Sequence, residues 1–444
     1  MKLCVLGGGG FRVPLIYRAL LRDTGSPRVD HVVLHDPDTG RADTIRAVLA
    51  QLADGVPDAP KVEVAADLDT ALTGSDFVFS AIRVGGLAGR IADERVALDA
   101  GVLGQETTGP GGLAYALRTV PVALRVAERV LARAPTAYVL NFTNPAGIVT
   151  EAMRGVLGDR VIGICDTPVG MGRRLATLLG VPPSRVWLDY AGLNHLGWLR
   201  RLVHDGVDLL PGLLADDALL ARTEEGAIFG VPWLRALRCV PNEYLYYYYF
   251  TRDAVRAAGA GVTRGEYLRD QQGSFYRAVA ADPGHALPLW TRAVAERGAT
   301  YMADARGARQ EEESGDEPGY EGVALAVLAA IARDRQTTMI LNVANGSTLA
   351  DLDADAVVEV PCAVDANGAH PLAVTPLDHH QSGLVRQVRT VERLTVQAAV
   401  TGSRDTALTA LALHPLVDSV TVAGELLTGY LARIPEIAAV LRNP

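Results

Sequence analysis

The chain has 444 residues, of which 49% are hydrophobic and 21% are charged. This is ordinary globular usage and excludes a disordered chain. The formal net charge is −9, and no basic domain or stripe occurs, so we expect no nucleic-acid partner.

The N-terminus lacks the apolar run of a signal peptide, and the most apolar helical stretch, 324–332, is about half the length that spans a bilayer. Four widely spaced cysteines without a C-x-x-C motif are typical of reduced thiols. The sequence therefore predicts a cytoplasmic protein without a membrane partner.

The first part of the chain alternates short apolar runs with helical patterns. The predicted strands are Leu3–Leu6, His31–Leu34, Asp76–Ile82, Ala137–Asn141 and Arg160–Ile164, and the predicted helices are Pro14–Arg22 and Ala114–Arg133. This alternation indicates parallel βαβ units. Residues 1–190 are therefore predicted to form a Rossmann-like, doubly wound sheet.

The pattern changes in residues 191–444. The predicted elements are two consecutive strands around a turn (Val186–His195 and Gly197–Val203), a surface loop (Gln310–Glu317), a helix (Tyr320–Asp334), two strands (Thr338–Asn345 and Ala356–Val364), and mostly helix from His380 onward. We expect an α+β domain that carries metal, substrate and oligomer contacts. The predicted class is α/β, with an overall architecture like that of lactate dehydrogenase.

A glycine-rich turn follows the first predicted strand and precedes a helix. This is the arrangement of a dinucleotide site, in which backbone N–H groups at a helix N-terminus meet a pyrophosphate. Asp36, at the end of the second strand, stands where a carboxylate accepts a hydrogen bond from a ribose hydroxyl. That carboxylate favours NAD over NADP, because it repels a 2′-phosphate. The third glycine of the usual motif is absent, so a turn without a ligand is the competing interpretation.

Polar clusters follow several predicted strands, at 83–86, 104–109, 141–145 and 165–168. Ligands of open α/β sheets bind beyond the carboxyl ends of the strands. Each cluster could instead cap a helix. Together they predict one cleft. We expect the cofactor to be contacted by Gly7, Gly9, Gly10, Phe11, Arg12, Asp36, Arg83, Glu106 and Asn141.

Cys165 ends a predicted strand, and His195 lies in a turn near the same edge of the sheet. A thiolate and an imidazole are suitable ligands for a divalent transition metal. A buried core cysteine and a structural histidine are the competing interpretation. The run 242–249 holds five tyrosines, most of which we expect on a packed helix face. A tyrosine near a metal could act as a base if the cation lowered its pKa.

Motifs spread from residue 1 to about 390 resemble, in order, the NAD- and divalent-metal-dependent glycosidases, family 4 of the glycoside hydrolases. The motifs are Gly7–Pro14, Arg83–Gly86, Gly104–Gly112, Asn141–Gly147, Gly163–Gly170, Gly192–Gly197, Pro241–Tyr249, Asn342–Gly346 and Val358–Cys362. The nearest likeness is to bacterial 6-phospho-β-glucosidases. The mechanism with two carboxylates that most glycosidases use does not apply to this NAD-dependent family.

The resemblance implies a role for each of several residues. Cys165 and His195 would bind Mn²⁺, Tyr244 would be the base at C2, and Asp166 would be an acid near the glycosidic oxygen. Asn144 would contact sugar hydroxyls, and Arg264, with Arg83 or Arg90, would hold a 6-phosphate. The implied reaction is oxidation at C3 by bound NAD, deprotonation at C2, elimination of the aglycone and addition of water. A homodimer or homotetramer is also implied.

Two departures leave alternatives open. The loop reads Gly9-Gly10-Phe11-Arg12, where relatives often carry Ser and Thr. Asp166 follows Cys165, where many β-specific members carry Asn and an α-specific group carries Asp. A 6-phospho-α-glucosidase and an enzyme for unphosphorylated glycosides therefore stay open. Two further alternatives stay open. One is a 2-hydroxy-acid dehydrogenase, which would leave Cys165 and His195 unexplained, and the other is a non-enzymatic NAD sensor.

Overall fold

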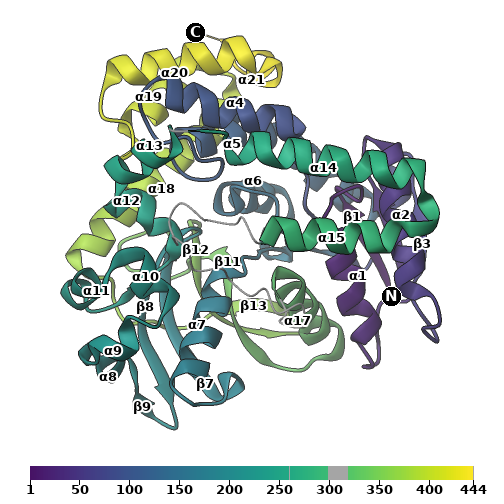
Figure 1. The fold of residues 1–444 in the computed structure, drawn as a ribbon, viewed down its shortest axis with the longest axis horizontal. Helices are drawn as coiled ribbons and strands as arrows, with labels where there is room; N and C mark the ends of the chain where they lie inside the picture. The colour runs from purple at the N-terminus through teal and green to yellow at the C-terminus, as the bar shows by residue number, and fades with distance from the viewer. Residues whose placement is uncertain (260, 299–318, 444) are drawn as a thin grey trace.

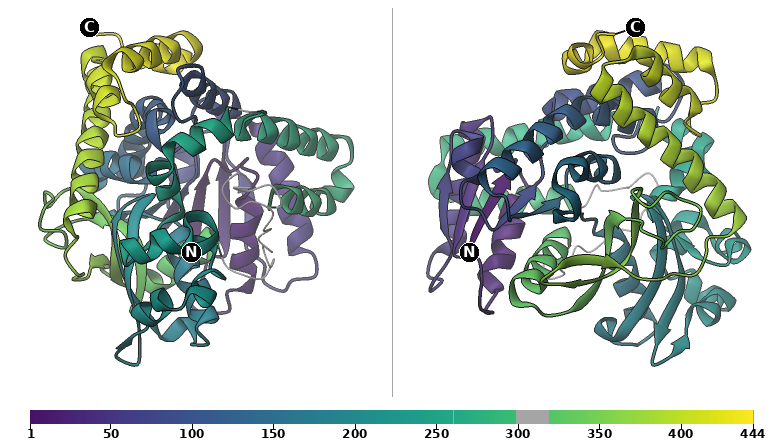
Figure 2. Two further views of the ribbon diagram at one scale, coloured as in Figure 1. Left: turned by 60° about the vertical axis from the view of Figure 1, so that its left-hand side comes forward. Right: turned by 180° about the vertical axis from the view of Figure 1, so that it is seen from behind.

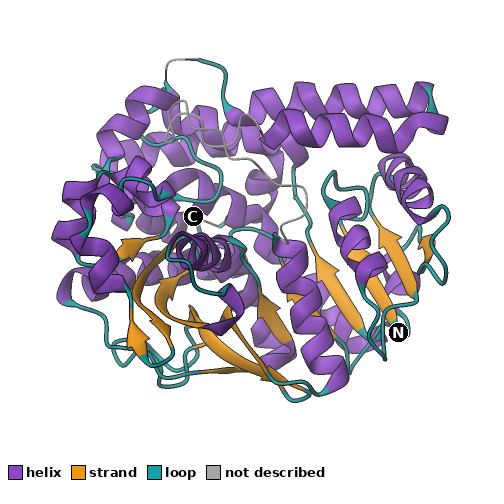
Figure 3. Cartoon of the chain, turned by 60° about the horizontal axis from the view of Figure 1, so that its bottom comes forward, coloured by secondary structure: helices purple, strands orange, loops and turns teal. Residues whose placement is uncertain are grey.

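The computed structural model describes residues 1–259, 261–298 and 319–443. Within these residues, 13 strands form one sheet that crosses the molecule, with helices on both faces (Figures 1 and 3). The strands are β1 (Lys2–Leu6), β2 (His31–His35), β3 (Lys61–Val64), β4 (Phe77–Ser80), β5 (Tyr138–Asn141), β6 (Val161–Gly163), β7 (Val186–Leu193), β8 (Leu196–His204), β9 (Val207–Asp208), β10 (Val240–Pro241), β11 (Thr337–Ala344), β12 (Val357–Asp365) and β13 (Gly368–Pro371).

The described helices flank this sheet (Figure 1). They are α1 (Val13–Arg22), α2 (Thr39–Ala53), α3 (Leu68–Leu72), α4 (Gly86–Asp99), α5 (Gly109–Arg133), α6 (Ala146–Leu157), α7 (Thr167–Leu178), α8 (Leu210–Ala215), α9 (Asp217–Leu220), α10 (Glu224–Phe229), α11 (Val231–Leu237), α12 (Tyr246–Tyr249), α13 (Thr251–Ala258), α14 (Arg264–Ala281), α15 (Ala286–Gly298), α17 (Tyr320–Arg333), α18 (His379–Thr401), α19 (Arg404–Leu413), α20 (Val420–Arg433) and α21 (Pro435–Val440).

The N-terminal half of the sheet is parallel, with the strand order β3-β2-β1-β4-β5-β6. This order is the doubly wound arrangement predicted from the alternation of apolar runs and helices. The middle residues of β1 and β2 and all residues of β4 are buried, as expected for strands covered on both faces. The switch point, where ligands bind in such sheets, lies between β1 and β4.

The sheet continues beyond β6 with antiparallel strands. β11 joins β6 through the pair Asn342↔Gly163, and the order continues β12-β7-β8-β10. The predicted turn between two consecutive strands is confirmed as the antiparallel pair β7 and β8. The boundary expected near residue 190 falls inside β7, and the division into two domains stays a prediction.

Helices from distant parts of the chain cover the site side of the N-terminal sheet. α14 contacts α4, and α15 contacts α2, so this helix pair lies over the loops that follow the parallel strands (Figures 1 and 2). α18 packs along α5, and α18, α19, α20 and α21 share a second core cluster with α4 and α5. No helix in the described part of the chain is both long and apolar enough to cross a bilayer.

Some predicted bounds differ from the observed ones. α5 begins at Gly109 rather than Ala114, because the glycine-rich segment before the apolar pattern is also helical. The tyrosine run is not one helix: a 3₁₀ turn, Glu243–Leu245, precedes the single turn of α12. The predicted surface loop Gln310–Glu317 lies outside the described residues.

Candidate active site

The glycine loop sits at the carboxyl end of β1, with Asp36 beside it. Gly7 has φ 79°, and a Cβ there would lie 2.5 Å from the Ala81 carbonyl oxygen, so only glycine fits this turn. Asp36 Oδ2 accepts a hydrogen bond from the Gly9 N–H at 3.0 Å. The structure therefore brings together the predicted loop and the predicted ribose acceptor.

Two aromatic side chains of the helix pair α14–α15 hold the glycine loop from outside the Rossmann-like part. The Tyr276 hydroxyl donates to the Gly9 carbonyl at 2.6 Å, and Trp290 Nε1 donates to the Phe11 carbonyl at 2.8 Å. The Phe11 ring is buried and packs edge-on against Phe275 at 5.3 Å. Its ring is therefore part of the hydrophobic core.

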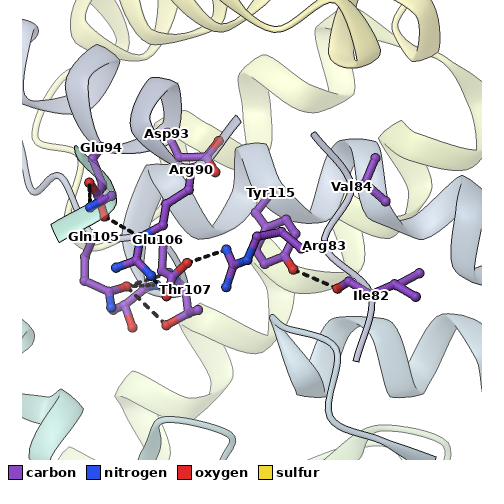
Figure 4. Close-up of polar contacts among 12 residues, drawn as sticks. Ile82, Arg83, Val84, Arg90, Asp93, Glu94, Gln105, Glu106, Thr107 and Tyr115 are labelled. Carbon is purple, nitrogen blue, oxygen red and sulfur yellow. Dashed lines mark hydrogen bonds and ion pairs between the residues drawn. The ribbon is translucent and has the colours of Figure 1, made fainter. Parts of the chain in front are cut away.

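Helix α5 positions Arg83 at the end of β4. The Tyr115 hydroxyl donates to the Ile82 carbonyl at 3.1 Å, and Arg118 Nε donates to the Val84 carbonyl at 3.0 Å (Figure 4). These two bonds hold the backbone on either side of Arg83. Sequence reasoning did not identify Tyr115 or Arg118, because both lie in an apolar helix that reads as core.

Glu106 joins the arginines that were predicted to bind anions. Its carboxylate forms ion pairs with Arg83 at 2.5 Å and with Arg90 at 2.6 Å, and Figure 4 shows the three side chains converging. Arg90 also pairs with Glu94 at 2.9 Å, and Glu94 accepts a hydrogen bond from the Gly265 N–H at 2.8 Å. Glu94 thereby ties the start of α14, and with it Arg264, to this cluster.

Among the described residues, this cluster holds more arginines than carboxylates. Burial disfavours the charged form of Glu106, but the charges of Arg83 and Arg90 outweigh this and lower its pKa to about 2. Burial, together with the charges of Arg12, Arg264 and Arg90, lowers the pKa of Arg297 to about 9. Arginines this close to one another suit a bound phosphate, which would offset their repulsion. Arg297 carries no local signal in the sequence, since only the packing of α15 brings it here.

A second group of residues lies in one row across four adjacent strands. Gly163 of β6 pairs with Asn342 of β11, Asn342 with Glu359 of β12, and Glu359 with Gly192 of β7. Cys165 follows this row on the β6 side, and His195 lies in the turn just beyond Gly192. The sheet register therefore brings the predicted metal ligands to one region.

Glu359 is a buried carboxylate at the centre of this row. It accepts hydrogen bonds from Tyr190 at 3.1 Å, from Asn194 at 3.0 Å and from Asn342 at 2.9 Å. Burial outweighs these donors and raises its pKa to about 7. Gly197 makes room for Tyr190, since a Cβ there would lie 2.4 Å from the Tyr190 hydroxyl. Sequence reasoning placed 358–362 in a motif but gave Glu359 no role.

Cys165, His195 and Tyr244 provide the chemistry expected of the site. The His195 ring stacks on the Tyr244 ring with centroids 3.7 Å apart and an interplanar angle of 6°. Burial lowers the pKa of His195 to about 3, so its imidazole is neutral and able to bind a metal. Burial and the charges of Glu359 and Asp166 raise the pKa of the Cys165 thiol well above its usual value. A cation would reverse this and favour the thiolate.

The donor set fits a metal that also binds a ligand. Among the described residues, no group of three or more His, Cys, Asp or Glu side chains is arranged to hold a metal alone. Cys165 and His195 would leave coordination positions for substrate oxygens. The Oδ1 atom of Asn144 is buried and has no hydrogen-bond partner within the described part of the chain. Such an acceptor suits a substrate hydroxyl.

Two other predicted residues take different positions. Asn141 is fully buried, and its side chain bonds to the Thr143 backbone and to Thr150 Oγ1 at 3.0 Å. These bonds hold the turn after β5, which gives Asn141 a structural position. Asp166 is the N-cap residue of α7, but its side chain makes no capping bond. Its carboxylate is half-buried directly beside Cys165.

Comparison with known proteins places the whole chain in one family. "Family 4 glycosyl hydrolase" matches residues 2–181, and "Family 4 glycosyl hydrolase C-terminal domain" matches residues 190–417. A probable 6-phospho-β-glucosidase of Bacillus subtilis (strain 168) is 32% identical over 96% of this chain and 95% of its own length. A 6-phospho-α-glucosidase of Leptotrichia buccalis is also 32% identical, over 96% of both chains.

Solved structures show the same relationship. The Thermotoga maritima 6-phospho-β-glucosidase, crystallised with manganese, NAD⁺ and glucose-6-phosphate, superposes with a TM-score of 0.83 at 27% identity, over 98% of this chain and 99% of that one. Malate dehydrogenase of Plasmodium falciparum, at 12% identity and a TM-score of 0.53 over 90% of this chain and 99% of that one, shares the fold alone. The predicted dehydrogenase-like architecture is confirmed. The chain belongs to family 4 of the glycosyl hydrolases.

Proposed function

We propose that this protein is a 6-phosphoglucosidase, with a preference for β-glucosides, that uses NAD and Mn²⁺. The observation that carries the proposal is the stacking of Tyr244 on His195 in the region that also holds Cys165. A cation held by His195 would lower the pKa of the Tyr244 phenol, and the resulting phenolate would be placed to take a proton from a sugar carbon in the site. The family relationship and the bound groups of the relatives support this assignment.

The glycine loop and Asp36 would hold NAD. Gly7 and Gly9 let the backbone approach the pyrophosphate, and the Asp36 carboxylate accepts from a ribose hydroxyl. Tyr276 and Trp290 keep the loop in place. When bound, NAD supplies reversible hydride transfer at a sugar carbon, which makes the neighbouring C–H acidic. Tyr244 then serves as the base that removes this proton.

Cys165 and His195 would hold Mn²⁺, and Asn144 would accept a hydrogen bond from a sugar hydroxyl. The metal, when bound, supplies Lewis-acid stabilisation of negative charge on the sugar oxygens. Glu359 accepts a hydrogen bond from Asn194, the residue before His195, and its charge acts on Cys165. A nearby cation would favour the ionised form of this buried carboxyl.

The arginine cluster would hold the 6-phosphate. Arg264 Nη2 donates a hydrogen bond to the Arg297 carbonyl at 3.1 Å, and Arg90 and Arg83 both form ion pairs with Glu106. Guanidinium groups recognise phosphate oxygens with directed, charge-assisted bonds. This cluster supports a phosphorylated substrate over a neutral glycoside.

Asp166 supports a second candidate, a 6-phospho-α-glucosidase. Its carboxylate is next to Cys165 and is not used to cap α7, so it is available as an acid toward a glycosidic oxygen. Relatives of both anomeric specificities match the chain at equal identity. The β-glucosidase is the first candidate because its solved relative superposes slightly better, with a TM-score of 0.83 against 0.80 for a 6-phospho-α-glucosidase from gut microorganisms at the same 27% identity.

The test is hydrolysis of p-nitrophenyl β- and α-D-glucoside 6-phosphates after removal of bound cofactors with EDTA and charcoal. We expect p-nitrophenol release only when NAD⁺ and Mn²⁺ are both restored, and faster release from the β-anomer. Release without either addition would refute the proposed mechanism, and a faster α-anomer would establish the second candidate. Unphosphorylated analogues serve as the control for the arginine cluster. The expected homodimer or homotetramer and the cytoplasmic location stay predictions.

A further inference from the structure

Thr107 connects the loop of the arginine cluster to His195. It follows Glu106 directly, and its Oγ1 lies 3.3 Å from His195 Nδ1. The same hydroxyl donates to Gln105 Oε1 at 3.2 Å. Figure 4 shows Gln105 and Thr107 side by side, with the dashed bonds between them. A chain of three polar groups therefore runs from Gln105 through Thr107 to His195.

The direction of this chain follows from the backbone around Gln105. Its Oε1 accepts from the Thr107 N–H at 2.5 Å and from the Thr108 N–H at 2.7 Å. Backbone N–H groups only donate, so the side-chain atom that faces them is the carbonyl oxygen, which only accepts. The Thr107 hydroxyl has one hydrogen, and Gln105 receives it.

The hydroxyl then offers His195 only its lone pairs. With the Thr107 hydrogen directed at Gln105 Oε1, the Nδ1–H tautomer of His195 is the one that can donate to Thr107. The neutral imidazole has a single N–H, so Nε2 is left with a free lone pair. No hydrogen bond to Nε2 from the described residues competes for it. The ring is 7% exposed and stacked on Tyr244, so its orientation is set as well as its tautomer.

We propose that Thr107 is a positioning residue that, through Gln105, fixes His195 in the Nδ1–H tautomer and presents Nε2 to the divalent cation. This inference rests on the proposed function, which places the cation at Cys165 and His195. Glu106 anchors the loop on its other side through Arg83 and Arg90. Hydrogen-bond partners of metal-bound histidines typically contribute about 10- to 100-fold to metal affinity.

The test is the Kd for Mn²⁺, measured from the electron paramagnetic resonance signal of free Mn²⁺ with NAD⁺ present. Thr107→Val keeps the shape but removes the hydroxyl, and we expect its Kd to rise by about tenfold or more. Thr107→Ser keeps the hydroxyl and is expected within about threefold of wild type. Thr108→Val is the matched control: it removes the neighbouring hydroxyl, which has no bond to His195, and should leave the Kd unchanged.

A second measurement reads the tautomer directly. In metal-free protein labelled with ¹⁵N-histidine, with His195 assigned by comparison with His195→Gln, we expect Nδ1–H in wild type and in Thr107→Ser. We expect a mixture of tautomers in Thr107→Val. An unchanged Mn²⁺ affinity or an unchanged tautomer in Thr107→Val would overturn the inference while the proposed function stands. A wild-type protein that binds no Mn²⁺ would refute both.

Discussion

Glu106→Gln tests whether the arginine cluster depends on one buried carboxylate. Glutamine has nearly the same shape as glutamate but lacks its charge, so Arg83 and Arg90 lose their shared counter-ion. The pKa of Glu106 falls from 4.5 to about 2, and each tenfold change in proton affinity corresponds to about 1.4 kcal/mol. The charged form is therefore favoured by about 3 kcal/mol, and we expect the free energy of unfolding at pH 7 to fall by about that amount.

The assay is urea unfolding of wild type and Glu106→Gln between pH 7 and pH 3. The pKa of Glu106 is lowered on folding, so its contribution is complete above its unfolded value of about 4.5 and is lost as the pH falls toward 2. The difference between the two proteins should therefore shrink as the solution becomes acidic. Inorganic phosphate should stabilise the variant more than wild type, because a bound anion replaces the missing charge.

Glu128→Gln is the matched control for this experiment. Glu128 is exposed on α5, and its replacement should change the free energy of unfolding by less than about 0.5 kcal/mol. A Glu106→Gln variant that loses less than about 1 kcal/mol, or one whose difference from wild type is the same at pH 7 and pH 3, would refute the reasoning about the cluster.

Three further predictions concern the chemistry of the site. Because burial raises the pKa of the Cys165 thiol, Mn²⁺ binding should release one proton, and the Mn²⁺ affinity should rise about tenfold per pH unit near neutrality. Titration calorimetry in buffers of different ionisation enthalpy measures the number of protons released. Binding without proton release would contradict the prediction. Tyr244→Phe keeps the ring stacked on His195, so the Mn²⁺ affinity should stay within about threefold of wild type, while exchange of the C2 proton in D₂O should slow about 10²- to 10⁴-fold. An unchanged exchange rate would show that another group is the base. Arg264→Ala should raise KM for a phosphorylated substrate about tenfold or more and leave that for its unphosphorylated analogue unchanged; equal effects on both would show a structural role.

Much of the fold follows from local patterns in the sequence. Short apolar runs such as Leu3–Leu6 and His31–Leu34 became β1 and β2, because strands buried on both faces need continuous apolar residues. The pairing of β7 and β8 around His195 follows equally from neighbouring residues. The glycine loop was recognisable for the same reason, since Gly7 meets a steric need set by the adjacent backbone.

Only the tertiary structure decided how distant residues combine into the site. Glu359 became the centre of a hydrogen-bonded row through the register of β11, β12 and β7, and Arg297 joined the arginine cluster through the packing of α15. Asn141, expected at a ligand, has its side chain bonded to Thr150 and to the Thr143 backbone, and only the folded chain brings these groups together. Local sequence sets which conformations a segment prefers, but burial and charge at a given atom depend on groups far away along the chain, and those come together only when the chain has folded.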